Sequence, residues 1–351
     1  MRNLAEGTCG SCVWTIDINR TLTIRPMDRK GTLESIHSVI FWPWDTYRRI
    51  IRKTVVEEGV KAGELLVGIF RNMRGCREFD VGHLDVSDTE NMGYAFFNCE
   101  NIESIPSIAQ WDTSNARTMG YMFYGCSRLT DISCVAGWNT ENVRAMTGTF
   151  AGCRKLTDIS PLAGWKTCNV RNMDFAFMDC MTLRDVSPLE NWDAKNAVSA
   201  QLAFCGCKKL RNADAIGNWD VRSMRDCYSI FRDTGVKENR LSEKMPMICP
   251  RTGSFTGYKK CMDGAVVELL ITEDARRSSA CGRKCRCDKA VVVRITNKHG
   301  LEVQKAVSEF DSSFIYRKGE TVSVPDFDPD RFNECSAGIH FFMTKEEAES
   351  Y

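Results

Sequence analysis

Cysteines offer the most direct reactive chemistry in this sequence, and several of them in the last third are candidate zinc ligands. Structural zinc takes four ligands in a tetrahedron and prefers thiolates. The spacing Cys281-x-x-x-Cys285-x-Cys287 differs from the usual Cys-x-x-Cys pair. The zinc hypothesis therefore draws on Cys281, Cys285, Cys287 and Cys261, with Cys249, Cys335 and His340 as further candidates.

Basic residues around these cysteines give two other interpretations. They are Arg276, Arg277, Arg283, Lys284 and Arg286. Positive neighbours lower a thiol pKa, and a basic turn can bind an anion. The alternative that we favour is a solvated basic loop without chemistry, since charge clusters usually remain solvated. We therefore predict no cofactor, with zinc as the alternative.

Cys9 and Cys12 form a Cys-x-x-Cys near the N-terminus. A redox motif would stand at a strand-to-helix junction, whereas this pair leads into alternating residues typical of a strand. A zinc site would need a second pair nearby. We interpret the two thiols as incidental to a turn, and residues 8–25 as a two-stranded hairpin that turns at 17–20.

Many of the other cysteines and aromatic residues belong to a sequence repeat. Three residue types recur every 27 residues, a period in the range of leucine-rich repeats. The ladders are Phe96, Phe123, Phe150, Phe177, Phe204 and Phe231; Trp111, Trp138, Trp165, Trp192 and Trp219; Cys99, Cys126, Cys153, Cys180 and Cys207. At a fixed position beside Phe, a cysteine is a small apolar core residue. We expect these ladders to be structural and the cysteines to be reduced.

The fold class predicted is a leucine-rich-repeat solenoid: a parallel β ladder of 27-residue coils with a β-hairpin cap at its N-terminus. Within each coil we place the strand at Leu-x-x-Ile, as in 129–132, and a helical or irregular turn at Met-x-x-x-Phe-x-x-Cys. Asn115, Asn142, Asn169 and Asn196 would satisfy backbone groups at the coil corners. Trp42 and Trp44 would cover the exposed first coil; a carbohydrate platform is the alternative.

Two charged columns are candidate binding stripes on the solenoid. They are Arg117, Arg144, Arg171 and Arg225, and Asp131, Asp158 and Asp185. Like charges stacked at one-coil spacing are mildly unfavourable unless something pairs them. The simpler interpretation is that these charged side chains pair with neighbouring columns or are solvated. The alternative is that an acidic partner binds along the arginine column.

Composition restricts the partners and the location. The net charge is +1, so nothing draws the chain as a whole to nucleic acid or to a membrane surface. No apolar run reaches the ~18 residues that span a bilayer, and the N-terminus lacks the apolar core of a signal peptide. We expect a cytoplasmic protein that binds another macromolecule.

The predicted domains are a hairpin and aromatic cap at 1–60, the solenoid at 61–235, a polar linker at 236–246 and a β-rich α+β domain at 247–351. The last domain ends in a capped helix over 344–351.

The repeat resembles a known family. The pattern Asp-x-Ser-Asn-x-x-x-Met-x-x-Met-Phe-x-x-Cys-x-x-Leu, which runs from Asp112 to Leu129, is similar to the BspA-like leucine-rich repeat of bacterial surface proteins. The block that begins Gly7-Thr-Cys-Gly-Ser-Cys resembles the segment before those repeats, so the resemblance covers about 7–235. It implies binding or adhesion without catalysis, often at a cell surface. We expect the chain to depart from that family in lacking its signal peptide and wall anchor.

The last hundred residues resemble an uncharacterised domain that phages and large viruses append to repeat arrays. The matching segments are Gly-Ser-Phe-x-Gly-x-Lys-Lys-Cys (253–261), Arg-Lys-Cys-Arg-Cys (283–287) and Glu-Cys-Ser-x-Gly-Ile-His-Phe-Phe (334–342). This resemblance covers about 245–351 and implies a phage, prophage or bacterial origin, with no activity attached.

A weaker resemblance gives the rival function. Gly338-Ile-His-Phe-Phe, followed by Ala348 and Tyr351, resembles the strand and helix that end ADP-ribosyltransferases. Tyr316, Arg317 and His340 would be the candidate residues, although their order differs from that family. We therefore predict non-enzymatic recognition through the solenoid face. The alternatives are an enzyme that the solenoid targets, with a C-terminal transferase, and a structural component of a virion.

Overall fold

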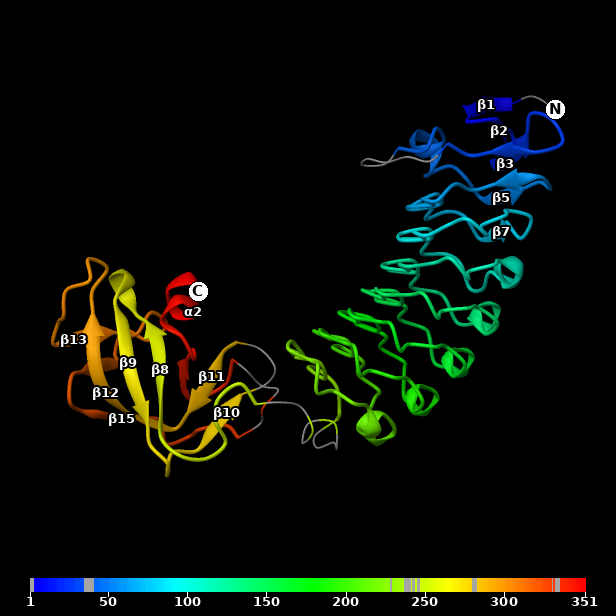
Figure 1. Cartoon of the computed structure of the whole chain (residues 1–351). Coiled ribbons are helices and arrows are strands. Elements are labelled where there is room, and N and C mark those ends of the chain that lie inside the picture. The colour runs from blue at the N-terminus through cyan, green and yellow to red at the C-terminus, as the bar shows by residue number, and fades with distance from the viewer. Residues whose placement is uncertain are drawn as a thin grey trace. The chain divides into compact units, whose positions relative to one another are not determined.

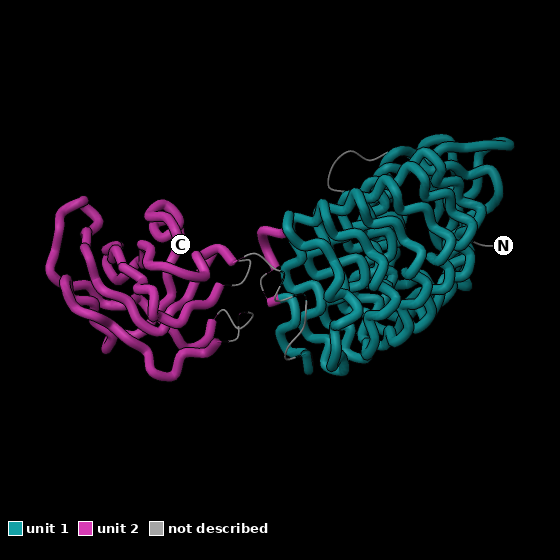
Figure 2. Tube along the Cα trace, turned by 60° about the horizontal axis from the view of Figure 1, so that its bottom comes forward, with its two compact units in different colours: residues 1–223, 230–244 teal, residues 224–229, 245–351 magenta. Residues whose placement is uncertain are grey.

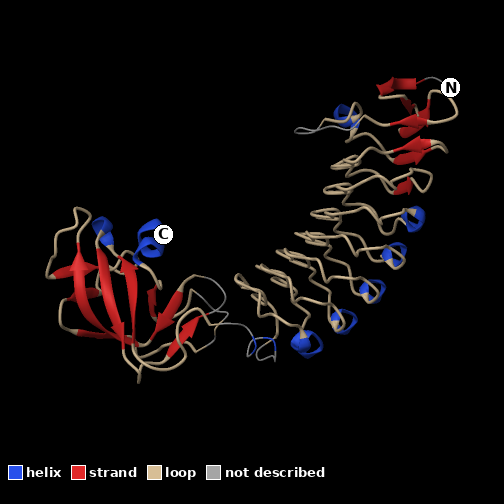
Figure 3. Ribbon diagram, in the orientation of Figure 1, coloured by secondary structure: helices blue, strands red, loops and turns tan. Residues whose placement is uncertain are grey.

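The computed structural model describes residues 3–34, 41–227, 229–236, 241, 244, 247–279, 283–329, 331 and 335–351. The chain forms two compact units: unit 1 comprises residues 1–223 and 230–244, and unit 2 comprises 224–229 and 245–351 (Figure 2). Strands and turns make up most of both units and helix is scarce (Figure 3), as expected for a fold of the leucine-rich-repeat kind. Most of the predicted linker lies outside the described residues.

Unit 1 opens with a five-stranded sheet (Figure 1). Its strands, in order, are β1 (Asn3–Cys9), β2 (Cys12–Asp17), β3 (Thr21–Pro26), β5 (Lys53–Val56) and β7 (Glu78–Asp80). The first three are antiparallel, and the turn predicted at 17–20 joins β2 to β3. From β3 onward the pairing is parallel, as is that of β4 (Gly31–Thr32) with β6 (Val60–Lys61). Along this sheet the strand pairing thus changes from the antiparallel pairing of hairpins to the parallel pairing of stacked coils.

The tryptophans after β4 close this end of unit 1. Trp42 and Trp44 are fully buried and stack with their ring centroids 5.3 Å apart. Their indole N–H groups donate to the carbonyls of Val67 and Ile69, each at 2.9 Å. A carbohydrate platform needs exposed rings, so burial favours the covering role.

Beyond β7, successive coils pair through single bridges rather than through strands. Parallel bridges link one residue of each coil, in the order Leu65, Asn91, Thr118, Ala145, Asn172 and Ser199. From Asn91 to Asn172 they directly precede the Met-x-x-x-Phe-x-x-Cys segment, and Leu65 and Ser199 precede its counterparts at Leu66 and Ala200. Placing the strand at Leu-x-x-Ile was therefore wrong for the coils after β7, in which that segment leads into a short 3₁₀ helix. In the first coil the equivalent residues around Phe79 do form a strand, β7. The helices are η2 (Pro106–Gln110), η3 (Ser133–Val135), η4 (Ser160–Leu162), η5 (Ser187–Leu189) and η6 (Asp214–Asn218).

The local sequence explains why the Leu-x-x-Ile segment forms a turn and why the Met-x-x-x-Phe-x-x-Cys segment pairs with the next coil. Asp158 accepts a hydrogen bond from the N–H of Ser160 at 2.8 Å, and proline follows at position 161. An aspartate that accepts the N–H two residues on and a fixed proline φ both favour a tight turn over an extended strand. In the other segment, the N–H groups of Met119, Tyr121 and Phe123 donate to the next coil at 2.7–3.1 Å. That segment therefore carries the inter-coil ladder.

Side-chain donors complete the contacts between coils. Each ladder tryptophan donates its indole N–H to a carbonyl 30 residues earlier, as Trp138 does to Ile108 at 3.1 Å. The ladder thiols do the same; Cys126 donates to the carbonyl of Phe96 at 3.2 Å. The corner asparagines reach a carbonyl 28 residues back, as Asn142 does to Ser114 at 2.7 Å. Coils that carry these residues are therefore bonded to their neighbours by the backbone ladder and by three kinds of side-chain donor.

The aromatic ladders also show that the stack is curved. Ring centroids of successive coils are 4.9 Å apart for Tyr94 and Tyr121, 5.6 Å for Phe96 and Phe123, and 6.3 Å for Trp111 and Trp138. Spacing that widens across the coil means that the tyrosines lie on the concave side and the tryptophans toward the convex side. The 3₁₀ helices follow the outer edge of this curve (Figure 3).

Unit 2 is built around a four-stranded antiparallel sheet in the order β15-β12-β9-β8. These strands are β8 (Phe255–Lys260), β9 (Val266–Ile271), β12 (Lys289–Thr296) and β15 (Thr321–Ser323). The smaller sheets contain β10 (Arg277–Ser279), β11 (Cys285–Cys287), β16 (Ile339–Phe341), β13 (Lys305–Val307) and β14 (Ile315–Arg317). The predicted terminal helix is α2 (Lys345–Ser350), and Thr344 and Glu347 form its capping box.

Nearly all described cysteines are free thiols, as expected from their apolar surroundings. Cys227 is the exception: it is disulfide-bonded, so the expectation that every cysteine is reduced was wrong for this position.

Candidate functional site

An aromatic cluster occupies the concave side of unit 1. We name Tyr94, Phe97, Tyr121 and Tyr124 the concave aromatic cluster. Tyr94 stacks on Tyr121 and Phe97 on Tyr124, each pair at 4.9 Å, and the two stacks touch through Tyr121 and Tyr124 at 5.9 Å. Tyr94 is 39% exposed and the other three rings are half-buried. Four rings thus share one solvent-facing surface over two coils.

The backbone holds these rings in an unusual conformation. Tyr94 and Tyr121 have φ values of 60° and 57°, a region that bulky residues rarely adopt. The equivalent position in the next coil is Gly148, where a Cβ would lie 2.6 Å from the Tyr121 ring. Glycine therefore leaves room for Tyr121 beside it. The same positive φ recurs at the equivalent positions Phe175 and Leu202, so it belongs to the repeat as a whole. The stacked, partly exposed rings are what make the cluster a candidate site.

The arginine column is exposed and only partly paired. Arg117 forms an ion pair with Glu90 at 2.8 Å. Arg144 and Arg171 lie in successive coils, joined by a backbone hydrogen bond of 2.8 Å, and neither pairs with a carboxylate among the described residues. Arg225 is exposed as well. Each arginine immediately precedes the bridge position of its coil, so the column borders the segment that carries the concave aromatic cluster.

The aspartate column does not belong to the same surface. Asp131, Asp158 and Asp185 each accept the N–H of the serine two residues on, at 2.8 Å. The N–H of Ser160 also lowers the pKa of Asp158. These carboxylates form tight turns just before the 3₁₀ helices of the convex edge, so the two columns do not form one stripe.

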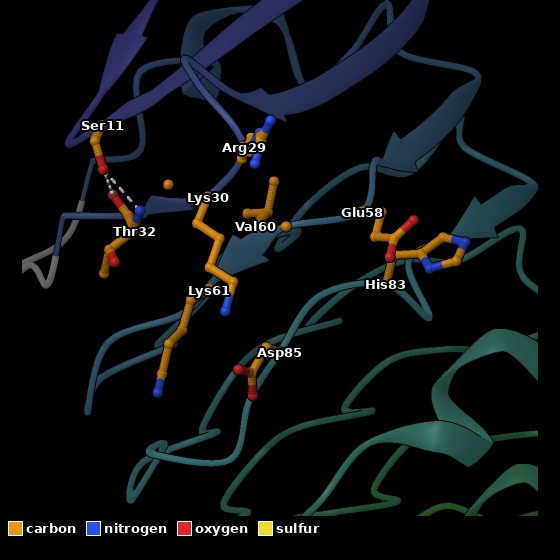
Figure 4. A pocket seen from close by; sticks show the side chains of 11 residues that line it. Ser11, Arg29, Lys30, Thr32, Glu58, Val60, Lys61, His83 and Asp85 are labelled. Carbon is orange, nitrogen blue, oxygen red and sulfur yellow. Dashed lines mark hydrogen bonds between the residues drawn. The ribbon is translucent and has the colours of Figure 1, made fainter.

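A mixed-charge hollow of about 630 Å³ lies near the N-terminal sheet (Figure 4). Lys30, Lys61 and Asp85 line it together with Ser11, whose hydroxyl accepts the N–H of Thr32 at 2.8 Å. Glu58 and His83 are exposed beside it. Its charged groups are solvated, so they gain little from desolvated contacts and the hollow shows no built site.

Unit 2 contains a smaller pocket of about 390 Å³, which we name the C-terminal pocket. Its walls come from β8, β14 and β16, the loops that follow β13 and β15, and the end of the chain. The lining includes Lys259, Lys284, Phe310, Phe314, Tyr316, His340 and Tyr351. Two of the three transferase candidates, Tyr316 and His340, therefore share one pocket, whereas Arg317 is exposed and does not line it.

Burial controls the charge state inside the C-terminal pocket. It lowers the pKa of His340 to about 4, with Lys284 adding to the effect, so the imidazole is neutral at pH 7. Its Nε2 lies 3.0 Å from the carbonyl oxygen of Ser336, which can only accept, so Nε2 carries the proton. Burial also raises the pKa of Tyr316 and lowers that of Lys259.

The structure describes only part of the predicted zinc-ligand set. Among the described residues, no group of three or more His, Cys, Asp or Glu side chains could hold a metal ion. Cys285 interacts with Cys249 rather than with Cys261, and the hydrogen bond between these two thiols lowers the pKa of Cys249 to about 7. Cys287 lies in the same strand as Cys285 and is buried. Cys281 is outside the described residues.

Cys9 and Cys12 face each other across the turn between β1 and β2. Both are buried, and burial raises the pKa of Cys12 to about 11 and that of Cys9 above its ordinary value. A thiol with a raised pKa is a poor nucleophile at neutral pH, which favours the incidental interpretation.

The sequence interpretation missed two features. The concave aromatic cluster falls in the segment treated as an irregular turn, although Tyr or Phe recurs there at positions 94, 97, 121 and 124. Lys259 was missed too; its signal is the alternation of Gly257, Lys259 and Cys261, which places a lysine among inward-facing residues of β8.

Comparison with solved structures finds leucine-rich-repeat proteins at low similarity. A leucine-rich cell surface protein from Faecalibacterium prausnitzii A2-165 is 15% identical, with a TM-score of 0.31, over 76% of this chain and 61% of that one. A leucine-rich repeat protein from Eubacterium ventriosum ATCC 27560 is 12% identical, with a TM-score of 0.19, over 70% of this chain and 98% of that one. At these scores neither likeness enters the argument about function.

Two family models match the sequence, whereas no curated protein does. The model described as "Family of unknown function (DUF5758)" matches residues 245–348. The second model matches residues 65–180 and 130–244, which together span just over half of the chain. No helix in the described part of the chain is long and apolar enough to cross a membrane. By the extent of the second match, the chain belongs to the family described as "Mycoplasma protein of unknown function, DUF285".

Proposed function

We propose that this protein is a leucine-rich-repeat solenoid that binds another protein through its concave side, without catalysis. The observation that carries the proposal is the concave aromatic cluster: four stacked rings, one exposed and three half-buried, on a backbone bonded from coil to coil. Aromatic rings clustered on an exposed surface are typical of binding sites. The phage, prophage or bacterial origin remains a prediction.

Rigidity gives this surface an advantage in binding. Binding orders side chains at a cost of about 0.5–1.5 kcal/mol for each one immobilised. Here each ring already stacks on a neighbour from the adjacent coil, so little rotational freedom remains to be lost. Tyrosines are also enriched among the residues that dominate interface energies.

The arginines next to this surface indicate the charge of the partner. Arg144 and Arg171 are stacked like charges with no carboxylate partner among the described residues. Acidic side chains of a bound protein would relieve their repulsion. We therefore propose a partner with an apolar segment for the rings and carboxylates along the arginine column.

The test is capture from bacterial lysate by the full-length protein, followed by affinity measurement with the partner that is identified. Tyr94→Asn with Tyr121→Asn removes two rings and retains a residue that tolerates positive φ. We expect affinity to fall at least about tenfold, since losing one dominant aromatic residue costs about 2 kcal/mol or more. Arg144→Gln with Arg171→Gln should weaken binding less and reduce its salt dependence.

Phe41→Asn is the matched control, because Phe41 is a 74% exposed ring outside the cluster. It should bind as the wild type does. Equal binding by the tyrosine variant, or capture of nothing by the wild type, would refute the proposal. The transferase alternative makes the opposite prediction, since it requires Tyr316 and His340 rather than the concave aromatic cluster.

A further inference from the structure

Lys259 is the most anomalous charged residue that the structure describes. It lies in β8, whose alternation turns Gly257, Lys259 and Cys261 toward the interior, and it is only 7% exposed. Its ammonium makes no hydrogen bond or ion pair with any described residue. Buried lysines are almost always paired, because an unpaired charge in an apolar site is costly.

The surroundings of Lys259 form the C-terminal pocket. Phe314 and Tyr316 lie in contact, at 5.2 Å between ring centroids, and Tyr316 is buried. At the other side, Lys284 is held over the ring of Tyr351 at 5.0 Å and that of Phe310 at 5.8 Å. The pocket therefore has aromatic walls, one buried cation and a second cation.

Among the described residues, no acidic group near the pocket forms an ion pair with Lys259. Asp311 lines the pocket, but it is exposed, and its Oδ1 accepts the N–H and the hydroxyl of Ser313 at 2.9 Å and 2.6 Å. Glu309 is exposed as well. In the part of the chain that the structure describes, Glu309 acts on Lys259 as an opposite charge from a distance, and no carboxylate makes a direct ion pair with its ammonium.

The geometry points to the C-terminal pocket as a binding site for a small aromatic carboxylate, whose carboxylate pairs with Lys259 and whose ring lies between the aromatic walls. A pocket of about 390 Å³ is within the range of small-molecule sites. A bound carboxylate would supply the missing partner of Lys259, and a charge-assisted hydrogen bond in a buried site is a strong one. His340, with its proton on Nε2, leaves Nδ1 free to accept a hydrogen bond from a ligand hydroxyl.

The experiment uses two probes of one shape, 2-naphthoate and its neutral analogue 2-naphthamide. Their binding to the full-length protein would be measured by isothermal titration calorimetry and ligand-observed NMR. We expect 2-naphthoate to bind at least about tenfold more tightly than 2-naphthamide. Lys259→Met should remove that preference, leaving both probes with the weaker affinity.

Lys260→Met is the matched control, since the neighbouring lysine points to the opposite face of β8, where it donates to the carbonyl of Glu349 at 3.3 Å. It should bind both probes as the wild type does. Lys259→Met is expected to fold, because an apolar side chain replaces an unpartnered buried charge. Thermal unfolding of both variants checks this point.

Three outcomes would overturn the inference: no binding of 2-naphthoate at millimolar concentration, equal affinity for the two probes, or undiminished preference in Lys259→Met. If Lys259→Met fails to fold, Lys284→Gln provides the second test, and an unchanged preference for the carboxylate would count against a cationic pocket.

Discussion

The two compact units place their polar side chains by opposite rules. In unit 1 the same donor recurs at one repeat interval: the indole of Trp138 bonds to Ile108 as that of Trp165 bonds to Val135. In unit 2 each contact is unique, and Lys259, Tyr316 and His340 meet from strands far apart in sequence. In a repeat the same side-chain contact recurs from coil to coil. In a non-repeating sheet, residues from distant parts of the sequence meet at one pocket.

That difference separates the kinds of function each unit can carry. Unit 1 offers an extended surface on which neighbouring coils present similar columns, which suits a macromolecule. Unit 2 offers a small pocket with one unpartnered charge, which suits a small ligand.

The largest effect is expected from breaking a ladder in unit 1. Phe150 is fully buried between Phe123 and Phe177, at 5.5 and 5.7 Å between ring centroids. Phe150→Ala should destabilise unit 1 by about 3–5 kcal/mol, because it leaves a cavity that the regular stack cannot close. Urea unfolding followed by tryptophan fluorescence measures this loss.

Hydrogen exchange would show where that damage spreads. Since coils contact mainly their neighbours, exchange should rise around positions 119–180 and stay unchanged in β12 of unit 2. Phe41→Ala should change the unfolding free energy by less than about 0.5 kcal/mol. Equal acceleration in β12 would mean that the two units unfold together.

The next effect concerns unit 2 and pH. The pKa of His340 is lowered from 6.5 to about 4, mainly by burial. Below about pH 6.5 the unfolded chain therefore binds a proton at His340 that the folded unit does not bind. The contribution of His340 to the free energy of unfolding is fully present above that pH, and it is lost as the pH falls toward 4. The loss is about 3 kcal/mol at most.

His340→Gln should remove this dependence, because glutamine can still donate to the carbonyl of Ser336 but does not titrate. Hydrogen exchange of β12 at pH 7 and pH 5 in both proteins gives the comparison. Identical slopes with pH would show that His340 is not the titrating group.

The smallest effect compares two buried indoles inside unit 1. Trp138 donates to Ile108, whereas the indole N–H of Trp14 is buried without a partner among the described residues. Trp138→Phe leaves a buried carbonyl without its donor and should cost about 1–2 kcal/mol more than Trp14→Phe. Matched chemical denaturation of the two variants measures the difference, and equal costs would mean that the ladder hydrogen bonds contribute little.

The period of 27 residues could be read from sequence because each repeat position meets the same neighbours in every coil. The position of the inter-coil ladder within the coil could not, because the choice depends on turn chemistry. The aspartate turn at 158–160 and the proline at 161 favour a 3₁₀ helix where Leu-x-x-Ile alone indicates a strand. The arginine and aspartate columns could be read from the sequence. Only the path of the coil shows that the aspartates form turns at the convex edge.

By itself, the sequence determined the repeat, its core ladders, the hairpin near the N-terminus and the capped terminal helix, since all of these follow from local pattern. Only the tertiary structure decided which face is concave and that Tyr94, Phe97, Tyr121 and Tyr124 lie on it. It alone placed Lys259 without a partner beside Tyr316 and His340. The reason is that curvature and burial are sums over contacts between distant residues, which spacing along one chain does not contain.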